Sequence, residues 1–405
     1  MKRRILGIDG MYFANRVLGG MTSQDETITL ESEQEQHNLL SNLHNSLWSL
    51  VRSFNSDTHT LIHNVVMFSD YGSWRKKLPA YTPAYYEDVL DSKVPVLGYK
   101  ENRIEKKQKS VINYDIFYRI VARFMDEISE QIPLIKIPDL EGDDCICLMS
   151  YMLKKSTNTE MVIFCTDGDL EQCVNDNVML FRNIRSKDCP NGEFVISQNK
   201  FRELFVDAID NPMTRLLGDS TEKTNYRMLF SMQLNSEYTV ERKPGKDIRY
   251  ACPATVALKK IVCGDAKDNV FPILRKVGES RNRSVSEKEL IKTIEYNGEK
   301  FCDETCANII NNEELRQNIF LTMRDVFKFL PDYSFARMEE HFQRNKNLIL
   351  LVPAEIGKDR VKQFVEYFKE NVEEKFNQTI TIPDKEREVK DNATELYADA
   401  VKGIL

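Results

Sequence analysis

Apolar residues follow two different periods along this chain, and the two patterns predict separate strands and helices. Continuous apolar runs at residues 4–8, 61–68, 134–137 and 161–165 are typical of strands that are covered on both faces. Apolar residues at steps of three and four across 31–54 and 112–132 predict amphipathic helices. Because strands and helices alternate, we expect an α/β fold with a mostly parallel central sheet flanked by helices.

The rest of the chain divides by its pattern into a strand pair and a helical part. Short apolar runs at 178–182 and 194–196, with Asn191-Gly192 between them, predict a hairpin. Residues 207–250 are polar and irregular and are interpreted as an insertion. We expect a first domain over 1–270, a smaller C-terminal helical domain over 271–382, and a charged tail over 383–405. After the insertion, the pattern predicts helices over 256–263, 286–296, 313–329, 336–346 and 358–376.

Acidic residues stand where the predicted strands stop or where a helix begins. Any one of these groups alone would be explained as a turn or a helix N-cap. Parallel strands present their carboxyl ends at one edge of a sheet, so we expect the groups to converge there. The set comprises Asp9, Asp70, Glu141, Asp143, Asp144, Asp167, Asp169, Asp265 and Asp268.

Clustered carboxylates without nitrogen or sulfur ligands suit hard divalent cations, namely Mg²⁺ or Mn²⁺. Two such ions about 4 Å apart can stabilise the attacking and leaving oxygens of phosphodiester hydrolysis. The nine cysteines include no CxxC pair, and the five histidines lie away from the acidic groups, so the spacing does not favour zinc.

The amino-acid composition excludes few classes of protein. With 41% hydrophobic and 29% charged residues, the chain is expected to be globular, and no apolar stretch is long enough to span a membrane. The cysteine usage favours reduced thiols in a cytoplasmic protein. The net charge is −7, but setting aside the nine clustered acids leaves +2, so charge does not exclude nucleic acid as a partner.

Basic and aromatic residues are interleaved over 71–110, directly after Asp70. Such a segment can contact phosphates and stack on unpaired bases, although a solvated surface insertion would look similar. A second basic stretch follows Asp268. The candidate phosphate contacts are Arg75, Lys76, Lys77, Lys100, Arg103, Arg275 and Lys276.

Several stretches together resemble the 5′-nuclease (flap endonuclease) superfamily, which is PIN-like, and in particular the ribonuclease H (5′-3′ exonuclease) enzymes of T-even bacteriophages. They are ILGIDG, VVMFSDYGSWRKK, YKENR, LEGDDCICLM, VIFCTDGDL and IVCGDAKDNV, in the family's order, and they cover most of residues 4–270. The run NLILLVPAEIGKDRVKQFVEYF resembles the C-terminal region of those enzymes.

The resemblance implies a Mg²⁺-dependent 5′-3′ nuclease with two ions, for which Mn²⁺ can substitute. Its substrates would be RNA·DNA hybrids, 5′ flaps and duplex DNA, and its role would be primer removal in DNA replication. It implies that 1–270 is the catalytic domain, that 71–110 is an arch for the 5′ end, and that 271–382 binds DNA. One ion would be held by Asp70, Glu141, Asp143, Asp144, Asp167 and Asp169, and the other by Asp9, Asp265 and Asp268 with the Asp167–Asp169 pair.

The same resemblance suggests a monomer, in the host cytoplasm if phage-encoded, with single-strand-binding protein and sliding clamp as partners. The family's glycine-rich turn after GDxxDN is absent, and Phe271–Gly278 stands in its place. Two alternatives remain open: a PIN-type ribonuclease, and a non-catalytic nucleic-acid-binding protein of the replisome. A haloacid-type phosphatase would need an Asp-x-Asp pair after the first strand, and Asp9-Gly-Met11 lacks it.

Overall fold

The computed structural model describes residues 3–55, 62–78, 98–182, 193–204, 248–276, 283–327 and 333–383. The predicted turn at 191–192, most of the insertion 207–250, part of the 71–110 segment and almost all of the tail 383–405 lie outside these ranges.

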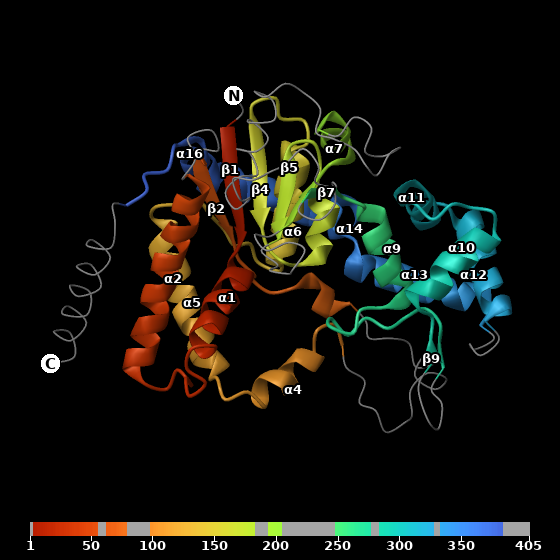
Figure 1. Cartoon of the computed structure of the whole chain (residues 1–405), viewed down its shortest axis with the longest axis horizontal. Helices are drawn as coiled ribbons and strands as arrows, with labels where there is room; N and C mark the ends of the chain where they lie inside the picture. The colour runs from red at the N-terminus through yellow and green to blue at the C-terminus, as the bar shows by residue number, and fades with distance from the viewer. Residues whose placement is uncertain are drawn as a thin grey trace, which may run out of the picture.

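A seven-stranded sheet forms the centre of the molecule (Figure 1). Its strand order is β3-β2-β1-β4-β5-β6-β7, and every neighbouring pair is parallel except β5 with β6. The prediction of a mostly parallel central sheet is therefore confirmed. The strands are β1 (Arg3–Asp9), β2 (Asn64–Phe68), β3 (Leu134–Ile135), β4 (Thr159–Phe164), β5 (Val178–Arg182), β6 (Glu193–Ile196) and β7 (Ile248–Tyr250).

One face of the sheet is covered by α1 (Gly10–Thr22), α2 (Glu33–Phe54) and α5 (Tyr114–Ser129). Successive strand residues point to opposite faces, so Leu6 packs with these helices and Ile5 packs on the other side. The predicted helices over 31–54 and 112–132 are confirmed as α2 and α5. The sequence pattern gave no prediction for α1, whose buried stripe of Phe13, Ala14 and Leu18 is short.

The opposite face is covered by α6 (Gly142–Leu153), by η2 (Gly168–Cys173) and by the last described helices. These are α14 (Pro353–Ile356), α15 (Lys358–Tyr367), a π turn η3 (Phe368–Val372) and α16 (Glu373–Asn377). The predicted helix over 358–376 thus exists, with a π turn in its middle. Its buried side chains Phe364, Phe368, Val372 and Phe376 join the core beneath this face of the sheet.

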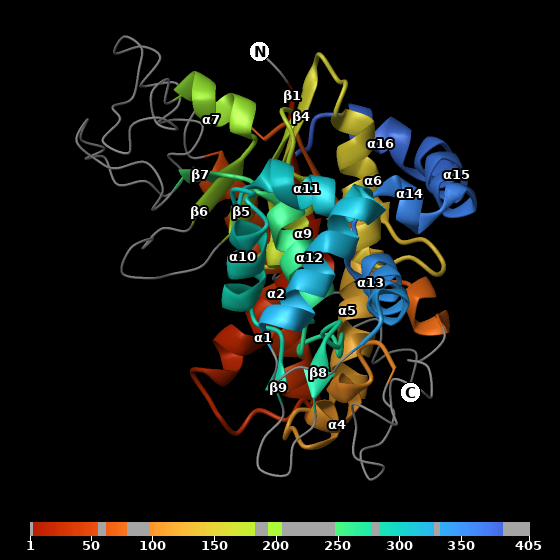
Figure 2. The same cartoon turned by 90° about the vertical axis from the view of Figure 1, so that its right-hand side faces the viewer.

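The remaining helices form a unit with an apolar core of its own, and Figure 2 shows them in front of the sheet. This helical unit consists of α9 (Pro253–Cys263), α10 (Glu287–Tyr296), α11 (Asp303–Asn311), α12 (Glu313–Val326) and α13 (Phe335–Ile349). Its core runs to Leu350, whereas Leu351 already packs on the sheet side. The predicted unit 271–382 therefore does not coincide with one apolar core, because α9 joins the helices and 351–376 returns to the sheet.

Several smaller elements complete the described part of the chain. They are η1 (Trp74–Lys77), α4 (Asn102–Gln108) and the two-stranded ribbon of β8 (Arg275–Lys276) with β9 (Arg283–Ser284), while α7 (Gln198–Leu204) follows β6. Among the described helices, none combines the length and the apolar character needed to cross a membrane.

Candidate metal centre

The ends of three neighbouring strands bring aspartates to one edge of the sheet. Asp9 is the last residue of β1 and pairs in register with Phe68, the last residue of β2, so that Asp70 follows two residues after the end of that strand. On the other side β1 pairs with β4, where Ile8 lies opposite Phe164 and Asp167 follows three residues later. The predicted convergence of these carboxylates is thus built into the register of the sheet.

A glycine allows the close approach of the first helix to this edge. A Cβ on Gly10 would lie 2.8 Å from the carbonyl oxygen of Phe68, so a side chain would push α1 away from the end of β2. Asp9 caps α1, and its Oδ1 accepts a hydrogen bond of 3.0 Å from the backbone of Tyr12. Burial and the nearby charge of Asp70 raise the pKa of Asp9 to about 6.

The start of α6 adds the next acids. Asp70 Oδ1 accepts a hydrogen bond of 2.7 Å from the backbone of Gly142, and enclosure by the protein raises the pKa of Asp70. Asp143 lies in the first turn of this helix. Burial, and then the charges of Asp9 and Asp167, raise the pKa of Asp143 well above its usual value. Asp143 therefore faces the strand-end aspartates.

A second group of carboxylates combines η2 with the turn that follows α9. One oxygen from each of Asp169, Asp265 and Asp268 lies within 4.8 Å of the others, a spacing that suits a single cation. The turn is tight: Gly264 has φ +80°, and a Cβ there would lie 2.6 Å from the carbonyl oxygen of Val270. The backbone of Asp265 closes the turn by hydrogen bonds with Val270 of 2.8 and 2.9 Å.

Lysine ammonium groups stand among these carboxylates. Lys260 Nζ lies 2.7 Å from Asp169 and 2.7 Å from Asp265, and Lys267 Nζ donates to Asp167 at 2.8 Å. Burial tends to raise the pKa of Asp167, but Lys267 outweighs it and the pKa falls to about 2. For Asp169, burial dominates over Lys260 and the pKa rises to about 6. Sequence reasoning passed over both lysines, although Lys267 lies inside the GDAKDN turn and Lys260 in the last turn of α9.

The donor set fits a divalent cation of the Mg²⁺ class. The acids brought together offer carboxylate oxygens, the donors that Mg²⁺ and Mn²⁺ prefer, while the Cys165 thiol donates to Asp9 Oδ2 at 3.3 Å. The raised pKa values of Asp9, Asp143 and Asp169 show that these negative charges are unfavourable as they stand. Added positive charge would relieve that repulsion, as the lysines already do in part.

Two of the predicted ligands are engaged elsewhere. Asp144 is fully buried and accepts hydrogen bonds from Arg75 at 2.7 and 2.9 Å and from Trp74 Nε1 at 3.2 Å. Glu141 caps α6 and is held by Lys100 at 2.7 Å and by Arg75 at 3.3 Å. Burial raises the pKa of Glu141, but these two cations outweigh it and hold the pKa below its usual value.

The structure separates the basic candidates into several groups. Arg75 is 2% exposed, so its predicted contact with phosphate does not fit: the guanidinium is buried against Asp144. Lys76 and Lys77 are exposed, and Lys77 pairs with Asp139 at 2.6 Å. Lys100 and Arg103 lie beside the carboxylates, where Arg103 pairs with Asp268.

The basic stretch after Asp268 is described only in part. The Arg275 guanidinium lies 5.0 Å from the centre of the Phe271 ring, half-buried at the base of the β8–β9 ribbon. The side chain of Lys276 lies outside the described part. The phosphate contacts proposed for both residues therefore stay predictions.

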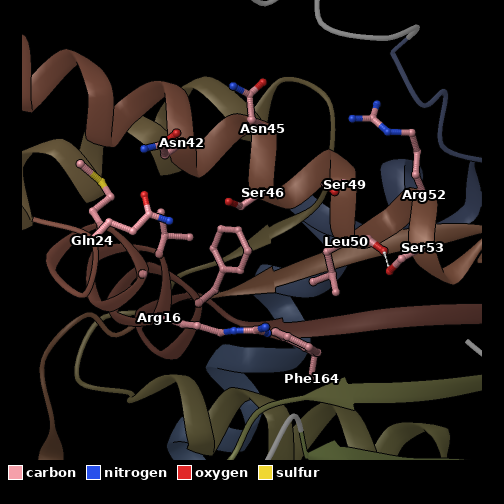
Figure 3. A pocket seen from close by; sticks show the side chains of 14 residues that line it. Arg16, Gln24, Asn42, Asn45, Ser46, Ser49, Leu50, Arg52, Ser53 and Phe164 are labelled. Atoms are coloured by element: carbon pink, nitrogen blue, oxygen red, sulfur yellow. Dashed lines mark hydrogen bonds between the residues drawn. The ribbon is translucent and has the colours of Figure 1, made fainter. Parts of the chain in front are cut away.

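A hollow between α1 and α2 lies apart from the carboxylates (Figure 3). Its volume is about 630 Å³, and it contains none of the predicted site residues. Arg16 lies beside Phe164 at its floor, with the guanidinium 5.4 Å from the ring centre. The polar side chains around it include Gln24, Asn42, Asn45 and Arg52.

Comparison with known proteins gives one family and several solved structures. The family described as 5′-3′ exonuclease, N-terminal resolvase-like domain, matches residues 4–205. The chain is similar to the T5 5′-exonuclease with bound zinc ions, at 14% identity and a TM-score of 0.45, over 91% of this chain and 99% of that one. It is also similar to a bacteriophage T5 flap endonuclease in complex with DNA and metal ions, at 15% identity and a TM-score of 0.42, over 92% of this chain and 100% of that one. No curated protein sequence matches the chain.

Proposed function

Because this chain belongs, through residues 4–205, to the 5′-3′ exonuclease family of the 5′-nuclease superfamily, we propose that it is a divalent-metal-dependent 5′-3′ nuclease. Its substrates would be RNA·DNA hybrids, 5′ flaps and duplex DNA. The observation that carries the proposal is the convergence of carboxylates at the carboxyl edge of the sheet, with Asp169, Asp265 and Asp268 within 4.8 Å of one another.

We assign the residues to two Mg²⁺ ions, for which Mn²⁺ could substitute. Asp9, Asp70, Asp143 and Asp167 would hold one ion, and Asp169, Asp265 and Asp268 the other. Such ions, when bound, lower the pKa of water and neutralise charge on the phosphodiester. Glu141 and Asp144 act through their neighbours: together with Arg75 they fix the start of α6, from which Asp143 projects.

The basic residues near the cluster would receive the nucleic acid. A phosphate approaching so many carboxylates is repelled, and the cations of Lys100 and Arg103 at the rim of the cluster offset that repulsion. Exposed Lys76 and Lys77 extend the positive charge outward along η1. Arg275 and Lys276 would contact the duplex from the β8–β9 ribbon, beside the helical unit, which we propose as the DNA-binding part.

The proposed role is removal of RNA primers or flaps during DNA replication. Single-strand-binding protein and a sliding clamp are the partners that the resemblance suggests, and the chain would act as a monomer. These parts of the proposal rest on the family resemblance of the motifs, which cover most of residues 4–270.

The test is cleavage of a 5′-labelled flap duplex and of an RNA·DNA hybrid by the full chain, with Mg²⁺ and with EDTA. We expect Mg²⁺-dependent release of short 5′ products, and the ratio of the two rates ranks the substrates. Tight binding of both substrates without cleavage in either Mg²⁺ or Mn²⁺ would overturn the proposal in favour of a binding role.

A further inference from the structure

A network of charged side chains contacts the loop that carries Asp167 and Asp169. At one end is Glu171, which lies two residues after Asp169 in η2 and is 3% exposed. Its carboxylate accepts hydrogen bonds from Arg249 Nη1 at 2.7 Å and Nη2 at 2.6 Å, and from the backbone of Cys252 at 2.8 Å. Both oxygens of this buried acid are therefore occupied by donors.

The network of side chains continues across strands β7, β6 and β5 and returns to the same loop. Arg249 Nε donates to Glu193 at 2.9 Å, and Arg182 Nη1 donates to the other oxygen of Glu193 at 2.9 Å. Arg182 Nη2 then donates to the carbonyl oxygen of Thr166 at 3.4 Å. Thr166 directly precedes Asp167, so the network contacts the loop on both sides of its two aspartates.

The same contacts fix the helix that leads to the second group of carboxylates. Arg249 lies in β7, and Cys252 is the N-cap of α9, the helix that carries Lys260 and ends just before Asp265. The far end of α9 is also fastened: buried Asn345 in α13 donates to the carbonyl oxygens of Ile261 at 2.8 Å and Phe271 at 2.7 Å. Glu171 joins the start of α9 to η2 through Cys252, and Lys260 joins the end of α9 to η2 through Asp169 at 2.7 Å.

We propose that Glu171 and Arg249 are positioning residues that hold η2 and α9 in the relation required by the ion site of Asp169, Asp265 and Asp268. The inference rests on the proposed function, because it concerns the ion that this function needs. The three carboxylates come from two elements distant in the sequence, so their spacing depends on a rigid contact between η2 and α9. A two-pronged guanidinium–carboxylate pair defines orientation as well as distance, which a lysine cannot do.

The experiment compares Arg249→Lys with Arg316→Lys in the full chain. Arg316 is a matched control because it forms a similar two-pronged pair with Glu339, at 2.7 and 2.5 Å, between α12 and α13 and away from η2. Mn²⁺ binding is measured by calorimetry without nucleic acid, and thermal unfolding is measured in EDTA. Loss of ligand-orienting contacts typically weakens metal binding about 10- to 100-fold.

We expect Arg249→Lys to weaken Mn²⁺ binding at one of two sites by at least about tenfold, while Arg316→Lys leaves both affinities unchanged. Glu171→Gln should give the same loss, and the double variant should be little worse than either single one, because the two residues act as one unit. High Mg²⁺ should restore cleavage by Arg249→Lys.

The two proposals fail in different ways. Equal losses of thermal stability in both variants with unaltered Mn²⁺ affinity would reduce Glu171–Arg249 to a structural ion pair and overturn the inference. A wild-type chain that binds no Mn²⁺ would overturn the proposed function itself. The comparison of Mn²⁺ affinities requires that Arg249→Lys is folded in EDTA, and a cooperative unfolding transition shows that it is.

Discussion

Arg75 Nη1 donates to both carboxylate oxygens of Asp144, at 2.7 and 2.9 Å, and both side chains are buried. In the sequence these residues resemble a phosphate contact and a metal ligand. In the structure they neutralise each other beneath the start of α6, and Trp74 completes the contact through Nε1. The pair therefore fixes the start of α6, and Asp143, one residue away, faces the other aspartates.

This pairing predicts a loss of stability when Arg75 is shortened. Arg75→Ala would leave Asp144 charged and buried without its partner, which typically costs about 3–5 kcal/mol of unfolding free energy. Lys76→Ala, at the next position and exposed, should change the unfolding free energy by less than about 0.5 kcal/mol. Urea denaturation in EDTA measures both, and equal stabilities of the two variants would contradict the prediction.

Asp143→Asn should separate stability from activity. It removes a carboxyl group whose pKa is raised by burial and by the charges of Asp9 and Asp167. The unfolding free energy of the metal-free protein should therefore rise by about 0.5–2 kcal/mol. Cleavage should be lost, and Mg²⁺ should raise the melting temperature less than in the wild type, because only the site of Asp169, Asp265 and Asp268 is left intact. Asp139→Asn is the matched control, because Asp139 lies three residues before α6 and pairs with exposed Lys77 instead. Full cleavage by Asp143→Asn would remove Asp143 from the ion site.

The stability of the metal-free protein should depend on pH through Asp9 and Asp169. Both have a folded pKa of about 6, above the usual 3.8, so the folded state binds more protons between these values. Their contribution to stability is therefore largest below about pH 4 and is lost as the pH rises through 6. Asp167, with a pKa of about 2, acts in the opposite sense and only at lower pH.

The measurement is the unfolding free energy of wild type minus that of Asp169→Asn, in EDTA, from pH 4 to pH 7. We expect this difference to fall across the range. With Mg²⁺ present the fall should be smaller, because bound cations stabilise the ionised carboxylates. A difference that does not vary with pH would show that Asp169 titrates normally in the folded chain.

Lys76 should contribute to nucleic-acid binding through its charge alone. Lys76→Ala should weaken binding of a 5′-flap duplex and reduce the slope of log K against log salt by about one. Lys155→Ala is the control, because Lys155 is exposed and lies between the end of α6 and the start of β4, at the opposite edge of the sheet from the carboxylates. Fluorescence anisotropy in EDTA, which prevents cleavage, measures both slopes. Identical slopes for wild type and Lys76→Ala would remove η1 from the binding surface.

The sequence alone was sufficient for strands β1 to β6 of the sheet and for the acids that follow them, whereas β7 lies at the end of the stretch 207–250 that was interpreted as an insertion. Buried strands are continuous apolar runs, and a parallel sheet aligns their carboxyl ends, so the convergence of Asp9, Asp70 and Asp167 follows from local pattern and topology. The absence of a CxxC pair, and of histidines near these acids, already disfavoured a zinc site.

Only the tertiary structure decided which acids face the cluster and what holds them there. Asp143 and Asp144 are neighbours, but successive helix residues are rotated by about 100°, so one points to the aspartates and the other to Arg75. The return of residues 351–376 to the sheet and the contact of Glu171 with Arg249 join segments far apart in the chain. Local periodicity carries no information about such contacts, because they depend on how complete elements pack against one another.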